Sequence, residues 1–146
     1  MKSEPSELSI DALSIKKLWH WDGVGNYQAR NYMRDEMSVG DLIIFYHSSC
    51  DAIGPAGIAK VASLPYPDHT QFDGKSQYFD PKSQIENPRW VMVDVAFVQK
   101  FPNTLSREEM KQTHKLKHML LWSRPRLSIM PISKVEFDTI AKLAKI

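Results

Sequence analysis

The feature that most constrains this chain is the run Trp90–Val98, in which β-branched and aromatic residues predominate. Such a composition favours an extended strand. A second run, Leu42–Tyr46, is apolar at every position, which is typical of a strand that is covered on both faces. Two strong strands in a chain of 146 residues predict a sheet at the centre of the fold.

Weaker patterns surround these two strands. Helices are expected where a capping residue precedes an apolar repeat, over residues 10–18 and 27–36 and from residues 107 and 134. Alternating residues predict strands at 58–64 and 127–132, whereas 19–26, 54–57 and 66–88 are expected to be turns or loops. Because helices and strands mix without a strict βαβ order, the pattern predicts an α+β fold in one domain, residues 1–146.

Composition excludes several classes of protein. Cys50 is the only cysteine, which excludes an internal disulfide framework and a Cys-rich zinc site. No segment approaches the ~20 apolar residues that span a bilayer, and the first residues lack a signal peptide's apolar region. We therefore expect no membrane association, no cofactor and a monomer, located in the cytoplasm, or in the nucleus of a eukaryote.

Charge is unevenly distributed along the chain. The net charge is +2, but residues 1–73 carry −4 and residues 74–146 carry +6. This asymmetry indicates a side that faces a polyanion, whereas the small total argues against a protein that grips long duplexes by charge alone.

Catalytic motifs are weak. The end of the run at Tyr46 brings His47, Ser48 and Cys50 close in sequence, but neighbours on a strand point to opposite faces, which places a nucleophile and a base poorly. His114 and His118 have an i, i+4 spacing without the glutamate of a zinc protease motif. No glycine-rich phosphate loop is present. We expect no catalytic residue and no metal ligand.

An aromatic and amide cluster is more informative. Its rings are Trp19, Trp21, Tyr27 and Tyr32, and its polar members are Asn26, Gln28, Arg30 and Asn31. Rings stack on a flat heterocycle, worth about 1–3 kcal/mol per base, while amides and guanidinium groups bond to its edge. The alternative is that the tryptophans belong to the core and the amides cap helices.

Several segments, which follow one another along the chain in the family's order, together resemble the EVE domain family, within the wider group of PUA-like folds. They are Met1–Pro5, Trp21–Val24, Asn26–Asn31, Phe45–Ser48, Tyr66–Phe72, Tyr78–Pro81, Pro88–Val95 and Arg126–Ile129. The resemblance implies a small mixed PUA-like β-barrel with flanking helices. It also implies a non-enzymatic domain that binds DNA or RNA and reads a modified base, such as a 5-modified cytosine, turned out into an aromatic pocket.

The resemblance also implies roles for particular residues. The base-pocket candidates are Ser3, Trp21, Asn26, Tyr27, Gln28, Asn31, Tyr46, His47, Ser48 and Ser128. The phosphate candidates are Lys2, Arg30 and Arg126. We also expect a basic rim beside the segment 21–31, to which the Lys and Arg residues of 107–126 contribute. Gly25 stands where the family usually has a basic residue, so one contact is missing or supplied by another residue.

Two other functions remain open at this point. The first is an enzyme that acts on a modified nucleotide or nucleic acid, using His47 and an acid. The second is a module that binds a small molecule or a protein in the same pocket.

Overall fold

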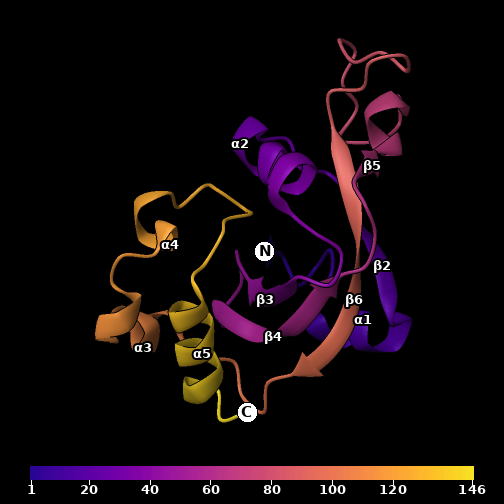
Figure 1. Cartoon of the computed structure of the whole chain (residues 1–146). Coiled ribbons are helices and arrows are strands. Elements are labelled where there is room, and N and C mark those ends of the chain that lie inside the picture. The colour runs from indigo at the N-terminus through magenta and orange to yellow at the C-terminus, as the bar shows by residue number, and fades with distance from the viewer.

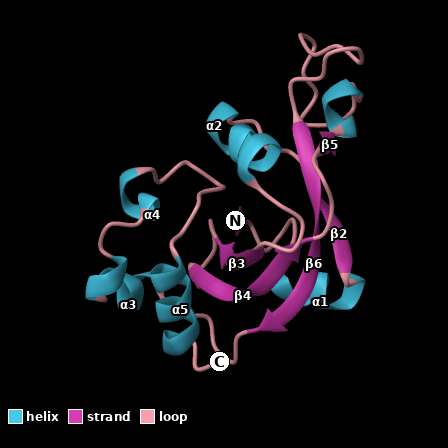
Figure 2. Cartoon of the chain, viewed as in Figure 1, coloured by secondary structure: helices cyan, strands magenta, loops and turns pink.

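A computed structural model describes all 146 residues and centres on a curled sheet (Figures 1 and 2). The strands are β1 (Lys2–Ser3), β2 (Leu18–Trp21), β3 (Leu42–His47), β4 (Gly54–Val61), β5 (Tyr66–Pro67) and β6 (Val91–Lys100). The sheet order is β1-β3-β4-β6-β2, and β5 pairs with the start of β6. β1 runs parallel to β3 and the other pairs are antiparallel, so the sheet is mixed.

Helices lie on both sides of this sheet. They are α1 (Ile10–Lys16), α2 (Tyr27–Asn31), α3 (Arg107–Lys111), α4 (Leu120–Ser123) and α5 (Lys134–Leu143). A π-helical turn, Tyr32–Glu36, continues α2, and 3-10 turns occupy His69–Phe72 and His114–Leu116. Figure 1 shows α3, α4 and α5 together on one side of β4, away from α1 and β2. None of the helices combines the length and apolar character needed to cross a bilayer.

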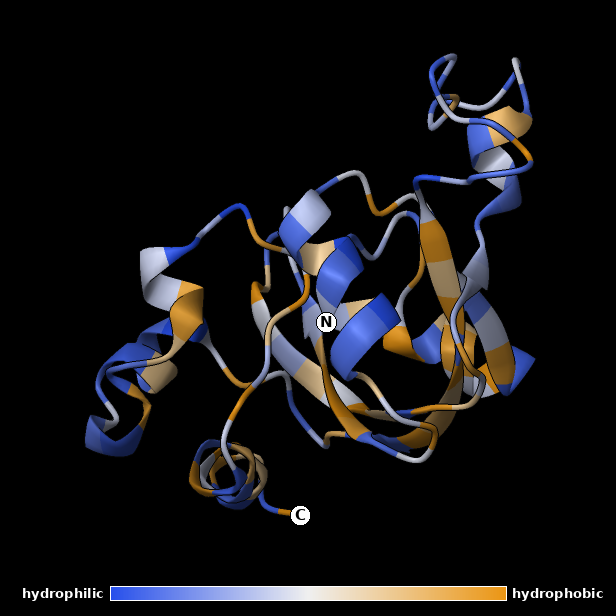
Figure 3. Ribbon diagram, turned by 45° about the horizontal axis from the view of Figure 1, so that its top comes forward, coloured by the Kyte–Doolittle hydropathy of each residue, from blue (hydrophilic) through white to orange (hydrophobic).

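Alternation along β3 explains the two-sided packing. Ile43 and Phe45 join a core with α1, α2 and β6, whereas Ile44 and Tyr46 join a second core with α3, α4 and α5. Successive side chains of a strand point to opposite faces, so a continuous apolar run requires cover on both. The prediction for the run Leu42–Tyr46 is confirmed from Ile43 onward, whereas Leu42 is exposed; Figure 3 shows apolar residues along the strands of the sheet and polar residues interspersed on the helices.

Several local predictions are wrong, among them the loop expected over 66–88, which contains strand β5 at Tyr66–Pro67 and the 3-10 turn His69–Phe72. Trp19–Trp21, expected in a loop, belongs to β2, whose four residues pair with β6 but are too short to show a period. Residues 127–132, expected as a strand, form none, although Ser128 accepts a backbone hydrogen bond from Lys2. Gly54–Gly57, expected as an interruption, is the first half of β4.

Close backbone approach explains the glycines of β4. A Cβ atom on Gly54 would lie 1.8 Å from the carbonyl oxygen of Leu105, and one on Gly57 would lie 2.5 Å from that of Gln99. Glycine in a strand often marks such an approach rather than a turn. The α+β class, with a small curled mixed sheet and flanking helices, is confirmed.

Candidate nucleic-acid interface

A polar cleft of about 530 Å³ opens between the N-terminal strand, the turn after β2 and the segment that follows α4. We call it the polar cleft; its lining is Lys2, Ser3, Glu4, Glu7, Leu8, Trp19, His20, Trp21, Asp22, Gly23, Val24, Gly25, Ser48, Ser49, Tyr78, Pro125, Arg126 and Ser128. Its volume lies within the range of about 300–1,000 Å³ that small ligands occupy in proteins.

Six of the residues predicted for the site line this cleft. They are Lys2, Ser3, Trp21, Ser48, Arg126 and Ser128. Ser3 and Ser48 are held together by a backbone hydrogen bond between β1 and the end of β3. Ser3 Oγ donates to the carbonyl of Leu8 at 2.7 Å, which leaves the lone pairs of the hydroxyl free to accept.

The predicted residues of α2 lie outside the cleft. Asn26 caps the helix by accepting from the amide of Ala29 at 3.0 Å. Gln28 donates to the hydroxyl of Tyr32 at 3.3 Å, and Asn31 Oδ1 accepts from Arg30 and Arg34. The helix-capping alternative is therefore correct for Asn26.

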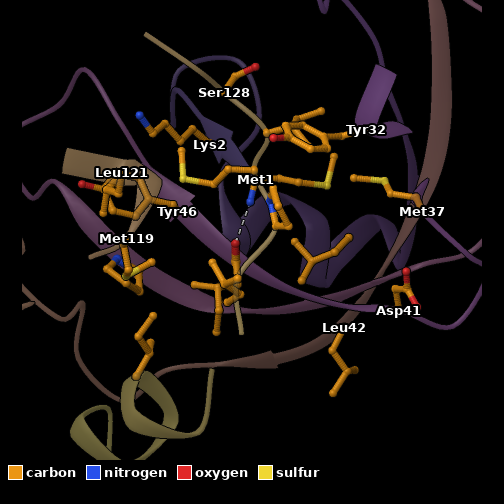
Figure 4. Close-up of a pocket in the computed structure, with 18 of the residues that line it drawn as sticks. Met1, Lys2, Tyr32, Met37, Asp41, Leu42, Tyr46, Met119, Leu121 and Ser128 are labelled. Atoms are coloured by element: carbon orange, nitrogen blue, oxygen red, sulfur yellow. Dashed lines mark hydrogen bonds between the residues drawn. The ribbon is translucent and has the colours of Figure 1, made fainter. Parts of the chain in front are cut away.

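Tyr46 and His47 also lie elsewhere. Tyr46 is buried and lines an adjoining apolar cavity of about 350 Å³, drawn in Figure 4, which shares Lys2 and Ser128 with the polar cleft. His47 lines neither space: its Nε2 accepts from the amide of Ile10 at 3.1 Å. Burial lowers the pKa of His47, an effect opposed by Asp11 and reinforced by Lys100. The hydrogen bond that Nε2 accepts and the burial of the ring both favour a neutral imidazole.

The apolar cavity is unsuited to reading a base. Figure 4 shows Met1 at its centre, where the terminal amino group donates to the carbonyl of Ile44 at 2.9 Å. Burial, assisted by Lys2, lowers the pKa of this amino group to about 5. Fifteen of its 21 lining residues are hydrophobic, so it offers few partners for the edge of a heterocycle.

Trp21 is largely a core residue. It is 7% exposed, belongs to the core formed with α1 and α2, and meets the ring of Phe45 edge-on at 5.6 Å between ring centres. Only its margin reaches the polar cleft. A ring in this position shapes the wall of the cleft and has little free face for stacking.

Sequence reasoning missed the carboxylates of the cleft. Of these, Glu7 accepts from the hydroxyl of Tyr78 at 3.1 and 3.2 Å, and Glu4 is exposed. Asp22 is partly buried and forms an ion-pair contact with His20, whose Nε2 lies 3.5 Å from Oδ2. Burial and the nearby Asp68 raise the pKa of Asp22, while His20 acts in the opposite direction.

Tyr78 closes one end of the cleft. Its hydroxyl bonds to Glu7, and burial followed by this bond raises its pKa to about 12. Its ring lies against Gly23, whose amide donates to the buried carboxylate of Asp68 at 2.8 Å. The long connection between β5 and β6, which projects from the sheet in Figure 1, thus contributes a wall of the site.

Two cations, Lys2 and Arg126, also line the cleft. Lys2 donates to the carbonyl of Pro125 at 3.0 Å, and burial and the nearby Arg107 lower its pKa. Neither Lys2 nor Arg126 forms an ion pair. The expected basic rim is therefore smaller than the sequence indicated, because Lys111, Lys115, Lys117 and Arg124 do not line the cleft.

This geometry defines a curled α+β domain with a polar cleft that is lined by both cations and carboxylates and is large enough for a nucleobase, and comparisons agree with the fold. The sequence model of the EVE domain matches residues 1–143. Thymocyte nuclear protein 1 of Homo sapiens is 43% identical over 162 aligned residues, covering 98% of this chain and 72% of the human protein. The chain belongs to the EVE domain family.

Solved structures show the same fold. A hypothetical protein from Leishmania major has a TM-score of 0.96 and 46% identity, covering 99% of this chain and 92% of that chain. The human THYN1 protein in complex with 5-methylcytosine-containing DNA has a TM-score of 0.95 and 41% identity, covering 100% and 96% of the two chains.

Proposed function

We propose that this protein binds DNA and holds a 5-modified cytosine, turned out of the duplex, in the polar cleft. The observation that carries the proposal is that one cleft holds both the carboxylate of Asp22, whose ion-pair contact is with His20, and two cations, Lys2 and Arg126, that form no ion pair. The likeness to the human protein in complex with 5-methylcytosine DNA supports the same ligand class.

The carboxylate matches the edge of cytosine. Cytosine presents an N4 amino group, a donor, where thymine presents the O4 acceptor, and Asp or Glu side chains accept from N4. Asp22, whose contact with His20 is made through Oδ2, is suited to accept this bond at Oδ1. The lone pairs of Ser3 add a second acceptor.

The cations match the backbone. Turning out a base costs a few kcal/mol, which contacts in the cleft and at the phosphates must offset. Lys2 and Arg126 supply two such contacts without a neutralising carboxylate. A reader of one base needs few phosphate contacts, in keeping with a net charge of only +2.

We further propose that binding involves no chemical step and a single copy of the chain. The Nε2 of His47, the base that the sequence suggested for the enzymatic alternative, accepts a backbone hydrogen bond, and His47 does not line the cleft. No three metal-ligating side chains gather in the structure. Such a reader acts where DNA is found, in the bacterial cytoplasm or the eukaryotic nucleus.

Fluorescence anisotropy tests the proposal. Labelled duplexes that differ at one position, carrying cytosine, 5-methylcytosine, 5-hydroxymethylcytosine or thymine, are titrated at several salt concentrations, with matching RNA strands as a further arm. We expect the tightest binding to a 5-modified cytosine in DNA and affinity that falls with salt. Equal affinity for all four duplexes would contradict base reading, and a product detected by mass spectrometry would favour an enzyme.

A further inference from the structure

Tyr27 forms a stacked pair outside the cleft. Its ring lies on that of Trp90 with 4.9 Å between ring centres and 25° between planes. The Arg30 guanidinium carbon is 4.7 Å from the Tyr27 centre and 5.9 Å from the Trp90 centre. A sandwich with Tyr27 in the middle would place Arg30 and Trp90 at roughly twice the stacking distance. Arg30 therefore does not stand opposite Trp90 across the ring of Tyr27, and Tyr27 remains 52% exposed.

The support beneath Tyr27 is fixed. Gln71, 1% exposed, accepts from the Trp90 amide at 3.1 Å and donates to the Trp90 carbonyl at 2.8 Å. Asp80 accepts from the indole Nε1 at 2.9 Å. With the bond from the Asp68 amide to the Trp90 carbonyl at 3.0 Å, four hydrogen bonds hold Trp90 in place, and an exposed ring on a fixed support is prepared for stacking with little ordering cost.

This aromatic pair begins where the cleft ends. Gly25 lines the polar cleft and also a neighbouring hollow that Trp90 lines. Tyr27 follows two residues later, a span of at most about 7 Å along the chain. Successive nucleotides of a duplex strand rise about 3.4 Å. A base next to the one held in the cleft is therefore within reach of Tyr27.

We propose that the exposed ring of Tyr27 is a stacking platform for a base adjacent to the everted cytosine, an inference that rests on the proposed function. Arg30 makes three hydrogen bonds, to Arg89 and Asn31, which leaves two of its five N–H groups for the neighbouring phosphate. Tyr27 thus lies outside the pocket and contacts the flanking sequence.

A double-mutant cycle between protein and DNA tests this contact. The wild type, Tyr27→Leu and Tyr27→Phe are titrated with four duplexes that carry 5-methylcytosine. One is intact, two have an abasic site at the 5′ or the 3′ neighbour, and the control has it several nucleotides away. We expect Tyr27→Leu to weaken binding of the intact duplex on the order of tenfold, and Tyr27→Phe to bind as wild type.

The coupling between Tyr27→Leu and each abasic site decides whether Tyr27 stacks on a neighbouring base. If Tyr27 stacks on a neighbouring base, removing that base and removing the ring cause the same loss, so the two changes together cost little more than either. Additive losses with both neighbouring abasic sites, in a wild type that prefers 5-methylcytosine, overturn the platform and leave the proposed function intact. A wild type that shows no preference for the modified duplex overturns both.

Discussion

Gly23 lies directly beneath the ring of Tyr78. A Cβ atom on Gly23 would stand 2.5 Å from Cζ of that ring, and the residue has φ of +72°, in the left-handed region. The phenol of Tyr78 reaches Glu7 from this position. The absence of a side chain at residue 23 therefore allows the distant segment that carries Tyr78 to close the cleft.

Gly23→Ala is expected to open this contact. The left-handed backbone costs a residue with a Cβ about 1–2 kcal/mol, and the ring of Tyr78 must move as well. We expect the free energy of unfolding in urea to fall by about 1–3 kcal/mol, within the range of backbone and packing mutations, and affinity for modified DNA to fall too.

Gly25→Ala is the matched control. A Cβ at Gly25 would meet no atom within 4 Å, and its φ lies outside the left-handed region. We expect stability within about 0.5 kcal/mol of wild type, as for an ordinary surface change. Equal losses in the two variants would show that the contact between Gly23 and Tyr78 has no special importance.

Gly25→Arg is expected to strengthen DNA binding. The position lines the polar cleft and has open space around it. One new phosphate contact makes the slope of log affinity against log salt steeper by about 0.9. Gly74→Arg adds the same charge in the long connection, also in open space, and should leave the slope unchanged. The same salt slope in the wild type, Gly25→Arg and Gly74→Arg would exclude a DNA phosphate near residue 25.

Asp22→Asn is expected to reduce discrimination between 5-methylcytosine and thymine. An amide retains an acceptor for N4 but adds a donor for the O4 of thymine. Competition titrations should show the preference reduced by about 1–3 kcal/mol, the value of a well-placed base contact. Asp51→Asn makes the same charge change at an exposed residue outside the cleft and should retain the wild-type preference. An unaltered preference in Asp22→Asn would assign base reading to another group.

Local chemistry made much of the fold predictable. The strand Trp90–Val98 and the two-sided run Leu42–Tyr46 are visible because their composition reports burial directly. The caps at Asn26 and Ser133 follow from side chains that bond within a few residues. β2 escaped prediction because four residues carry no period, and its rings resemble those of a binding loop.

The site depended on contacts that no spacing reveals. The resemblance placed Lys2, Ser3, Arg126 and Ser128 at the cleft because those segments keep their order in the family. It did not predict that the ring of Tyr78 packs against Gly23, because the two residues are far apart in the chain and make contact only after the long connection between β5 and β6 folds back. Trp21, a plausible stacking ring by composition, is mainly a core residue, since burial depends on the whole sheet.

The neutral His47 makes stability depend on pH. Its Nε2 accepts from the Ile10 amide, and burial lowers its pKa below the ordinary value of 6.5. Between the folded pKa and 6.5 the unfolded chain binds more protons, so the free energy of unfolding rises with pH through this window. The contribution is complete above 6.5 and is lost as pH falls through the folded value.

Urea unfolding of the wild type and His47→Gln from pH 5 to pH 8 isolates this effect. Glutamine keeps an acceptor for the amide of Ile10 but does not titrate, and the other ionisable groups contribute equally to both proteins. We expect the wild type to lose stability relative to the variant as pH falls below 6.5, while the difference stays constant above that value. A difference that is the same at every pH would mean that His47 binds a proton equally well in the folded and unfolded chains, and a reversed slope would mean that the folded protein holds it charged.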